Sequence, residues 1–251
     1  MSSLTAESLV VRRDGATLID GVSLALGPRG SVAVIGPNGA GKSTLLRMLA
    51  GVDTPTSGHV RLDGQNLAGL ASVERAQAVG FLPQTFEPHW DLSVADLLEL
   101  GAARAAALPA DAVAKAKHAF ELSGLEARRW STLSGGERAR VLLATVLVVD
   151  PPVLIADEPS AALDIRHRLE TIRTLAARGG EQLSVVVVHD LDLAFRFFER
   201  VVLLAKGKVV ADAPAHDLIH DSRLDETFGV RFDRLKVGGR WMLTPSPSLS
   251  P

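Results

Sequence analysis

Residues 36–44, with the sequence GPNGAGKST, combine glycine, lysine and hydroxyl side chains at the spacing of a phosphate-binding loop. The glycines allow backbone N–H groups to converge on a small anionic volume, because glycine adopts conformations that other residues avoid. The Lys42 ammonium would lie against the β- and γ-phosphates of a nucleotide, and the Ser43 hydroxyl would reach a magnesium ion. We therefore predict phosphate contacts for the whole loop: Gly36, Pro37, Asn38, Gly39, Ala40, Gly41, Lys42, Ser43 and Thr44.

The residues on either side of this phosphate loop supply the elements that the motif requires. Residues 31–35 (SVAVI) form a short β-rich run typical of a buried strand, and apolar residues recur at helical spacing over residues 45–50. Gly51 is a natural C-terminal stop for that helix. A strand, the loop and a helix are thus expected in succession, with the positive end of the helix dipole directed at the phosphates.

A second apolar run, residues 153–157 (VLIAD), ends in two adjacent carboxylates, Asp157 and Glu158. A magnesium ion beside a phosphate loop needs a carboxylate ligand at the tip of a neighbouring strand, and Asp157 suits that position. Glu158 would point elsewhere and polarise an attacking water as general base. A solvated acidic turn is the alternative, but the phosphate loop favours the catalytic interpretation.

Residues 133–137 (LSGGE), called the signature segment below, place a serine and two glycines before a helix predicted to extend to about residue 147. Backbone N–H groups at a helix N-terminus bind anions, which gives a second phosphate-binding surface at Ser134, Gly135 and Gly136. One nucleotide seldom needs both surfaces from one chain. We therefore predict a head-to-tail homodimer in which each chain's signature segment covers the other's nucleotide.

These motifs, in the order GPNGAGKST, LSGGE and VLIADEP, resemble those of the ATP-binding subunit of an ABC transporter, and the resemblance covers about residues 4–235. It implies ATP and Mg²⁺ as ligands. It also implies that Gln84 senses magnesium and water and couples to the membrane subunit, and that residues 160–164 cross the dimer interface. His189 matches the histidine that contacts the γ-phosphate, although a lone histidine at a strand end is more commonly a surface residue.

The sequence departs from this family at the position where an aromatic residue usually stacks on the adenine. Arg13 stands there, the chain has no tyrosine, and no aromatic residue precedes Phe81. The guanidinium plane of Arg12 or Arg13 would be able to stack on the base instead. Both are equally consistent with ordinary arginines at a strand end.

The order of elements predicts an α/β fold of the P-loop NTPase type with a mixed, largely parallel core sheet. A helix at residues 165–178 between strands at 153–156 and 185–188 makes a βαβ unit, which requires parallel strands. An N-terminal antiparallel β subdomain, a further core strand and a hairpin complete the expected strands: 9–11, 22–26, an edge strand at 59–62, then 79–82, 201–205 and 208–211.

A helical insertion is predicted at about residues 87–150, where alanine and leucine are abundant. Ser93 and Asp96 form an N-terminal capping pair, and a second helix is expected to begin at Pro109 and end at residues 123–124. The predicted ATPase domain spans residues 1–235, followed by a C-terminal tail at 236–251 that ends in a low-complexity Pro/Ser stretch.

Composition excludes several classes of function. The 251 residues carry 27 basic and 29 acidic side chains, which argues against a nucleic-acid partner bound by bulk charge. The absence of cysteine excludes disulfides and thiolate metal sites, and His216 with His220 are expected to form a solvated face rather than a zinc site. The N-terminus lacks a signal pattern, and the apolar runs, such as residues 141–149, are too short to cross a bilayer. Any role at a membrane would therefore require a partner.

Three kinds of ABC protein remain open: the ATPase subunit of an importer, that of an exporter, and a non-transport ATPase. The last usually has tandem cassettes or a long coiled-coil insertion, and residues 87–132 show no sustained heptads. Residues 74–84, 189–194, and 201–210 with 224–232 resemble the importer ATPases for iron-siderophore, haem and cobalamin uptake. An importer subunit would lie at the cytoplasmic face of the membrane, bound to integral-membrane permease subunits and indirectly to a substrate-binding protein.

Overall fold

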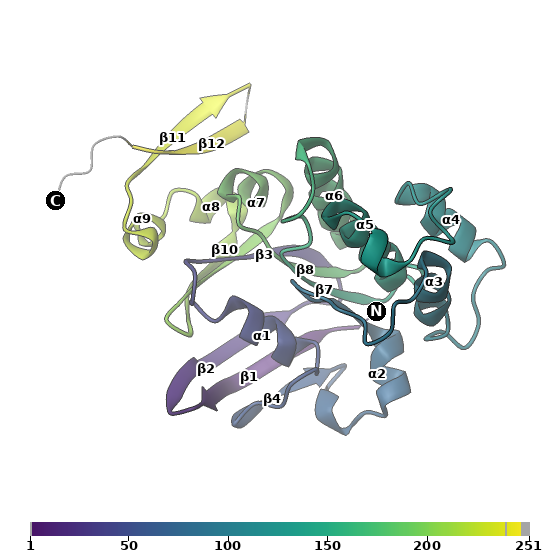
Figure 1. Ribbon diagram of the computed structural model, residues 1–251. Helices are drawn as coiled ribbons and strands as arrows, with labels where there is room; N and C mark the ends of the chain where they lie inside the picture. The colour runs from purple at the N-terminus through teal and green to yellow at the C-terminus, as the bar shows by residue number, and fades with distance from the viewer. Residues whose placement is uncertain (1, 239, 247–251) are drawn as a thin grey trace.

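The computed structural model describes residues 2–238 and 240–246, and its central sheet is shown in Figure 1. Within the described chain this sheet has six strands, of which five run parallel and one, the edge strand that forms a hairpin with its neighbour in the sheet, runs antiparallel. Their order is β10 (Lys208–Pro214), β9 (Arg200–Ala205), β3 (Gly30–Ile35), β8 (Leu183–Val187), β7 (Val153–Asp157) and β6 (Val79–Leu82).

Strand β3 shows why this sheet is buried on both faces. Val32 and Val34 belong to the apolar cluster on one side, whereas Ala33 and Ile35 belong to the cluster on the other. Parallel strands covered on both faces are apolar at successive positions rather than alternating. The mixed, largely parallel sheet predicted from the sequence is confirmed.

The chain also forms a second, antiparallel sheet. Helix α1 (Lys42–Leu49) lies between this sheet and the central sheet and packs against both (Figure 1). Strand 59–62 was expected at the edge of this sheet; instead it pairs on its outer side with a two-residue strand after the Asp63-Gly64 turn. The order in this sheet is β2 (Ala16–Leu26), β1 (Leu4–Arg13), β4 (Ser57–Leu62) and β5 (Gln65–Asn66), followed along the chain by η1 (Leu67–Gly69) and α2 (Ser72–Ala78).

The helices after residue 90 cover the opposite face of the central sheet and extend beyond it. Three of them, with a short 3-10 turn, enclose an apolar cluster of their own that includes Trp130 and Leu133. Others pack directly on the sheet. The helices and 3-10 turns of this part of the chain are α3 (Val94–Ala102), α4 (Ala112–Ala119), η2 (Trp130–Thr132), α5 (Gly135–Leu147), α6 (Ile165–Ala177), η3 (Arg178–Gly180) and α7 (Leu191–Phe197).

Helix α4 is shorter at both ends than the sequence predicted. Pro109 lies in a turn whose carbonyl accepts a hydrogen bond from Ala112 N, so the helix begins at Ala112. It ends at Ala119 because Glu121 adopts a positive φ of 51°, which breaks the helical path before Ser123. The predicted capping pair of α3 is confirmed, since Ser93 Oγ accepts from Asp96 N at 3.1 Å and Ser93 N donates to Asp96 at 2.8 Å.

The C-terminal part of the described chain contains a hairpin that contacts α7. Residues 240–245, which belong to the predicted tail, pair with residues 232–237 in an antiparallel hairpin, and Leu243 N donates to Asp192 Oδ1 of α7 at 2.7 Å. His220 is exposed, as expected for a solvated face, and its ring meets that of Trp241 edge-on. The predicted tail residues 247–251 lie outside the described residues. The elements are α8 (Ala215–Leu218), α9 (Ser222–Phe228), β11 (Phe232–Val237) and β12 (Arg240–Pro245).

No helix in the described ranges is both long and apolar enough to cross a membrane.

Candidate functional site

The candidate site lies where four neighbouring parallel strands end. Strand β3 leads into the phosphate loop and β8 leads to His189. Strand β7 ends at Asp157, followed by Glu158, and β6 is followed by Gln84. Because β3, β8, β7 and β6 are adjacent and parallel, their carboxyl ends lie along one edge of the sheet. The fold therefore brings together residues that are far apart in the sequence.

The phosphate loop depends on glycine at two points of close approach. Gly36 has φ of 149°, and a Cβ there would lie 2.1 Å from Leu204 O. Gly41, the residue before α1, has φ of 100°, and a Cβ there would lie 2.6 Å from Leu18 O. The loop is thus pressed against β9 and β2, with the N-terminus of α1 directed at the space that the loop encloses.

We expect Gly36→Ala to destabilise the protein by several kcal/mol, because the added methyl overlaps a backbone carbonyl that cannot rotate away. Gly39→Ala is the matched control: Gly39 also has a positive φ, 76°, but no atom lies within 4 Å of the added Cβ. That variant should lose only about 1–2 kcal/mol. Thermal unfolding of the two variants measures the difference; equal losses would contradict the proposed clash.

Lys42 is nearly buried, with 7% of its surface exposed. Its ammonium donates to Gly36 O at 2.8 Å and to Pro37 O at 3.0 Å, so the side chain folds back over the loop. Burial lowers the pKa of the Lys42 ammonium, and the nearby Glu158 and Asp157 carboxylates oppose that shift. The ammonium therefore lies at the mouth of the loop, held by acceptors that an incoming phosphate can replace.

Asp157 is 3% exposed, and its Oδ1 has no hydrogen-bond partner in the described part of the chain. Burial raises the pKa of the Asp157 carboxyl, and a hydrogen bond with the Ser43 side chain partly offsets this. A buried carboxylate oxygen without a partner is costly and is rare unless a ligand completes it. The pair Ser43 and Asp157 therefore fits a divalent cation with oxygen ligands.

Glu158 is the centre of a small polar cluster. Gln84 Nε2 donates to Glu158 Oε2 at 2.9 Å, and His189 Nε2 lies 2.9 Å from Glu158 Oε1. Glu158 has a positive φ of 50°, an uncommon conformation for a residue other than glycine. Its side-chain partners are Gln84 and His189, whereas Asp157 bonds with Ser43, and the roles predicted for the two carboxylates stay predictions.

A cavity of about 470 Å³ is lined by the phosphate loop from Asn38 to Thr44 and by Gln84, Glu158 and His189, whereas Gly36, Pro37 and Asp157 are not among its described lining residues. Eleven residues of the described chain line it, and Leu18 from β2 is the one that the sequence analysis did not anticipate: Leu18, Asn38, Gly39, Ala40, Gly41, Lys42, Ser43, Thr44, Gln84, Glu158 and His189. The strand predicted at residues 22–26 did not reach Leu18, and no sequence signal linked Leu18 to the loop.

The signature segment lies outside this cavity. Ser134 is the N-cap of α5, with its Oγ accepting from Glu137 N at 3.3 Å and its own N donating to Glu137 Oε2 at 2.7 Å. A Cβ on Gly135 would lie 3.6 Å from Ala162 Cβ, so the segment packs beside residues 160–164. Among the described residues that line the cavity, none belongs to residues 134–136. The structure does not bring the two predicted phosphate surfaces of one chain together.

Residues 19–161, more than half of the chain, match the ABC transporter family. The chain belongs to this family. The hemin import ATP-binding protein HmuV of Nocardia farcinica is 39% identical over 237 residues, covering 90% of this chain and 82% of that protein. The protein of the same name from Bordetella avium is 38% identical and covers 93% of this chain and 94% of its own length.

A solved structure of another ABC protein agrees with the fold. The dimeric, post-hydrolysis state of the ATP-binding cassette MJ0796 bound to ADP and Pi has a TM-score of 0.77 and 27% identity, covering 84% of this chain and 98% of that chain. The α/β P-loop fold and the family expected from the motifs are confirmed.

Arg13 is not among the described residues that line the cavity of this ABC subunit. Its Nη2 lies 3.6 Å from Asp53 Oδ2, and Asp53 also accepts two hydrogen bonds from Arg47, at 2.7 and 2.8 Å. The Arg13 side chain is 63% exposed. A role in stacking on the adenine stays a prediction for Arg13, and the structure adds Asp53 as the carboxylate that orients it.

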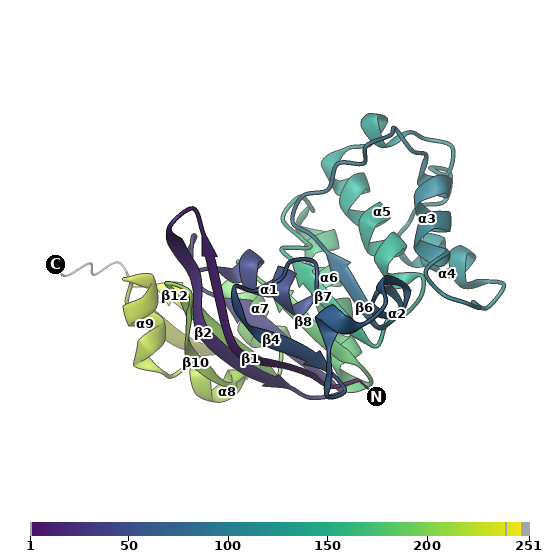
Figure 2. The ribbon, with the colours of Figure 1, turned by 90° about the horizontal axis from the view of Figure 1, so that it is seen from below.

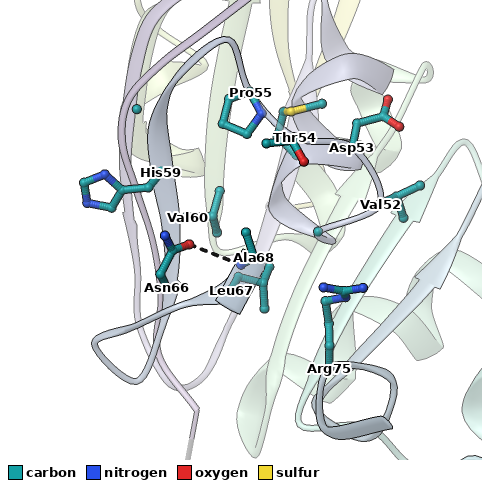
Figure 3. Close-up of a pocket in the computed structure, with 13 residues that line it drawn as sticks. Val52, Asp53, Thr54, Pro55, His59, Val60, Asn66, Leu67, Ala68 and Arg75 are labelled. Carbon is teal, nitrogen blue, oxygen red and sulfur yellow. Dashed lines mark hydrogen bonds between the residues drawn. The ribbon is translucent and has the colours of Figure 1, made fainter. Parts of the chain in front are cut away.

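A second cavity, of about 270 Å³, lies beyond the C-terminal end of α1 (Figure 3). Its lining includes Asp53, Val60, Leu67 and Arg75, and it shares no residue with the first cavity. Figure 3 shows Arg75 reaching toward it from α2. No sequence motif marks this cavity, and nothing in its lining resembles the phosphate site.

Proposed function

We propose that this chain is the ATP-hydrolysing subunit of an ABC importer and that its cargo is a metal chelate of the hemin class. The convergence of Lys42, Glu158 and His189 on one cavity carries the ATPase assignment. The relatives that this chain matches over most of their length are named hemin import ATP-binding proteins, and these names support both import as the direction of transport and hemin as the cargo class. The cargo would bind the permease, so residues of this chain do not contact it.

Magnesium would be held by the Ser43 hydroxyl and the Asp157 carboxylate, with Gln84 facing the same space. When bound there, the ion would neutralise charge on the β- and γ-phosphates. Lys42 would exchange its bonds to Gly36 O and Pro37 O for bonds to phosphate oxygens. The phosphate-loop amides and the N-terminus of α1 would bind the remaining charge.

Glu158 would accept a proton from the attacking water, and its two hydrogen-bonded neighbours would fix its orientation. His189 is exposed enough, at 55% of its side chain, to turn toward a γ-phosphate when the nucleotide enters. Gln84 would respond to the binding of the metal and the water, because it is hydrogen-bonded to Glu158. These roles make the cavity a hydrolytic site rather than a passive binding site.

A homodimer would complete each site, because Ser134, Gly135 and Gly136 lie outside the cavity of their own chain. The dimeric ADP-bound cassette that this chain resembles supports that assembly. Each signature segment would then approach the γ-phosphate held by the partner. The pair would bind permease subunits at the cytoplasmic face of the membrane, with a substrate-binding protein acting on the far side.

We expect Ser134→Arg to abolish ATP-dependent dimerisation and to lower phosphate release at least about tenfold, because a bulky cation replaces the cap where the partner's nucleotide approaches. ATP binding to the phosphate loop should be retained. Ser222→Arg, at the exposed start of α9, is the control. Size-exclusion chromatography with Mg-ATP and a phosphate-release assay measure both effects. A fully active, dimeric Ser134→Arg protein would rule out the composite site.

The cargo class is tested in the host by deleting the gene and measuring uptake of hemin, ferric siderophore and cobalamin separately. Loss of hemin uptake alone supports the proposal. Complementation with the Lys42→Ala variant should fail, since the variant lacks the cation that holds the phosphates. Loss of export of a compound, with all three uptakes intact, would assign the exporter function instead.

A further inference from the structure

A cluster of four side chains joins the segment after Gln84 to the segment before Ser134. Trp130 Nε1 donates to Glu87 Oε2 at 3.1 Å, and Phe86 meets the Trp130 ring edge-on at 5.6 Å between centroids. Arg138 lies over the same ring at 5.2 Å, with its Nη1 3.6 Å from Glu87 Oε1. We call Phe86, Glu87, Trp130 and Arg138 the Trp130 cluster.

The cluster depends on the bond between Trp130 and Glu87. Trp130 is 4% exposed, so its indole N–H needs a partner in the protein, and Glu87 supplies one. The Glu87 side chain is itself 75% exposed, and nothing buried requires it at that position except this bond and the Arg138 guanidinium. Removing the carboxylate would leave a buried donor unpaired without disturbing the core around Glu87.

Each end of the cluster is close to one of the two predicted phosphate surfaces. Glu87 follows Gln84, which is bonded to Glu158, by three positions. On the other side, Arg138 belongs to α5, where its N donates to Ser134 O at 2.9 Å and its Nε donates to Trp130 O at 3.2 Å. Figure 2 shows the chain between β6 and α3 passing alongside α5.

Further hydrogen bonds hold the two segments together. Ser131 N and Oγ both bond to the Asp91 carboxylate, each at 2.9 Å, and Trp130 N donates to Leu92 O at 2.8 Å. These side-chain contacts therefore connect the segment that follows Gln84 directly to the segment before Ser134, without the long stretch of chain between them.

We propose that the Trp130–Glu87 contact is a positioning contact for ATP hydrolysis, which sets the signature segment according to the state of Gln84 in the same chain. The inference rests on the proposed composite dimer. Since Gln84 belongs to one nucleotide site and Ser134 to the other, the contact links the two sites of the dimer. Glu87 and Trp130 touch neither nucleotide and act through Gln84 and Ser134.

The first test is a double-mutant cycle with Glu87→Ala, which removes the acceptor, and Trp130→Phe, which removes the donor and keeps an aromatic, though smaller, side chain. Each should lower kcat about tenfold and reduce the cooperativity of hydrolysis toward ATP, whereas the Kd of the monomer for ATP should stay within about twofold. The kcat of the double variant should be no lower than that of the less active single variant. Glu87→Gln, which retains an acceptor, should recover most of the rate.

Matched controls are Glu99→Ala, on the exposed face of α3, and Trp90→Phe, whose ring is 71% exposed. Additive losses in the cycle would show that the two residues do not act through their contact, and a rise in Kd that accounts for the lost rate would show that the defect lies in nucleotide binding; either result would overturn the proposal. Wild-type kcat and cooperativity in Glu87→Ala would also overturn it.

Fluorescence supplies a readout that turnover does not. Three tryptophans are present, so the Trp90→Phe/Trp241→Phe background leaves Trp130 alone. We expect Mg-ATP to change the Trp130 emission in this background and to have no effect once Glu87→Ala is added; an unchanged emission in the parent overturns the coupling. If the wild-type chain neither binds nor hydrolyses ATP, the proposed function has failed, whereas active wild type with an inert cluster removes only this inference.

Discussion

Replacing Glu158 by glutamine is expected to lower steady-state phosphate release at least about 100-fold while leaving ATP binding intact. The reason lies in the contacts that Glu158 makes with Gln84 and His189. Glutamine has the same length as glutamate and can keep the contacts with Gln84 and His189, each of which is 2.9 Å long with the native Glu158. It cannot, however, accept a proton from water. The variant should therefore accumulate as an ATP-bound dimer, because closure no longer leads to hydrolysis.

Size-exclusion chromatography with Mg-ATP, followed by analysis of the bound nucleotide, measures the trapped dimer, and a coupled assay measures phosphate release. Glu181→Gln, an exposed carboxylate after η3, controls for the loss of one negative charge. If Glu158→Gln turns over at the wild-type rate, Glu158 is not the base, and the function of the cluster around it would have to be purely structural.

The residues around Glu158 show why so much of the site was predictable from the sequence. Gln84, Asp157 and His189 each follow a short apolar run that the sequence identifies as a strand. Once those runs are parallel and adjacent, the polar residues after them must meet at one edge of the sheet. The apolar pattern of the strands and the rule that parallel strands end at one edge of the sheet were sufficient to predict these residues, without knowledge of any long-range contact.

Other features depend on contacts that no local pattern encodes. Lys42 folds back onto Gly36 O and Pro37 O, and Glu87 completes the N–H of Trp130, only because packing places them together. Helix α4 ends early because Glu121 adopts a left-handed conformation, a choice that its sequence of ordinary helix-forming residues does not signal. Tertiary structure overrode local propensity there. The domain boundaries at residues 87–150 and 235 stay predictions.

The second large effect concerns Asp157, and its sign differs between stability and activity. We expect Asp157→Asn to lower Mg²⁺-dependent turnover at least about 100-fold, because the carboxylate that we propose as a metal ligand is replaced by a neutral amide. The same change should stabilise the nucleotide-free, metal-free protein by about 1 kcal/mol, or roughly 2–4 °C in Tm. Asp157 buries a carboxylate whose Oδ1 has no partner in the described chain, so the native residue reduces stability in return for function.

The pH dependence distinguishes this explanation from a general packing effect. Burial raises the pKa of Asp157, so the folded protein holds that proton more tightly than the unfolded chain, and wild-type stability falls as pH rises from the ordinary carboxyl pKa of 3.8 through the raised value. The asparagine variant lacks this loss. Its advantage in Tm, measured with a chelator present, should therefore be full at neutral pH and shrink in acidic buffer. Asp233→Asn, on the exposed side of β11, should show no such gain. An advantage of equal size at both pH values would mean that the buried charge is not its cause.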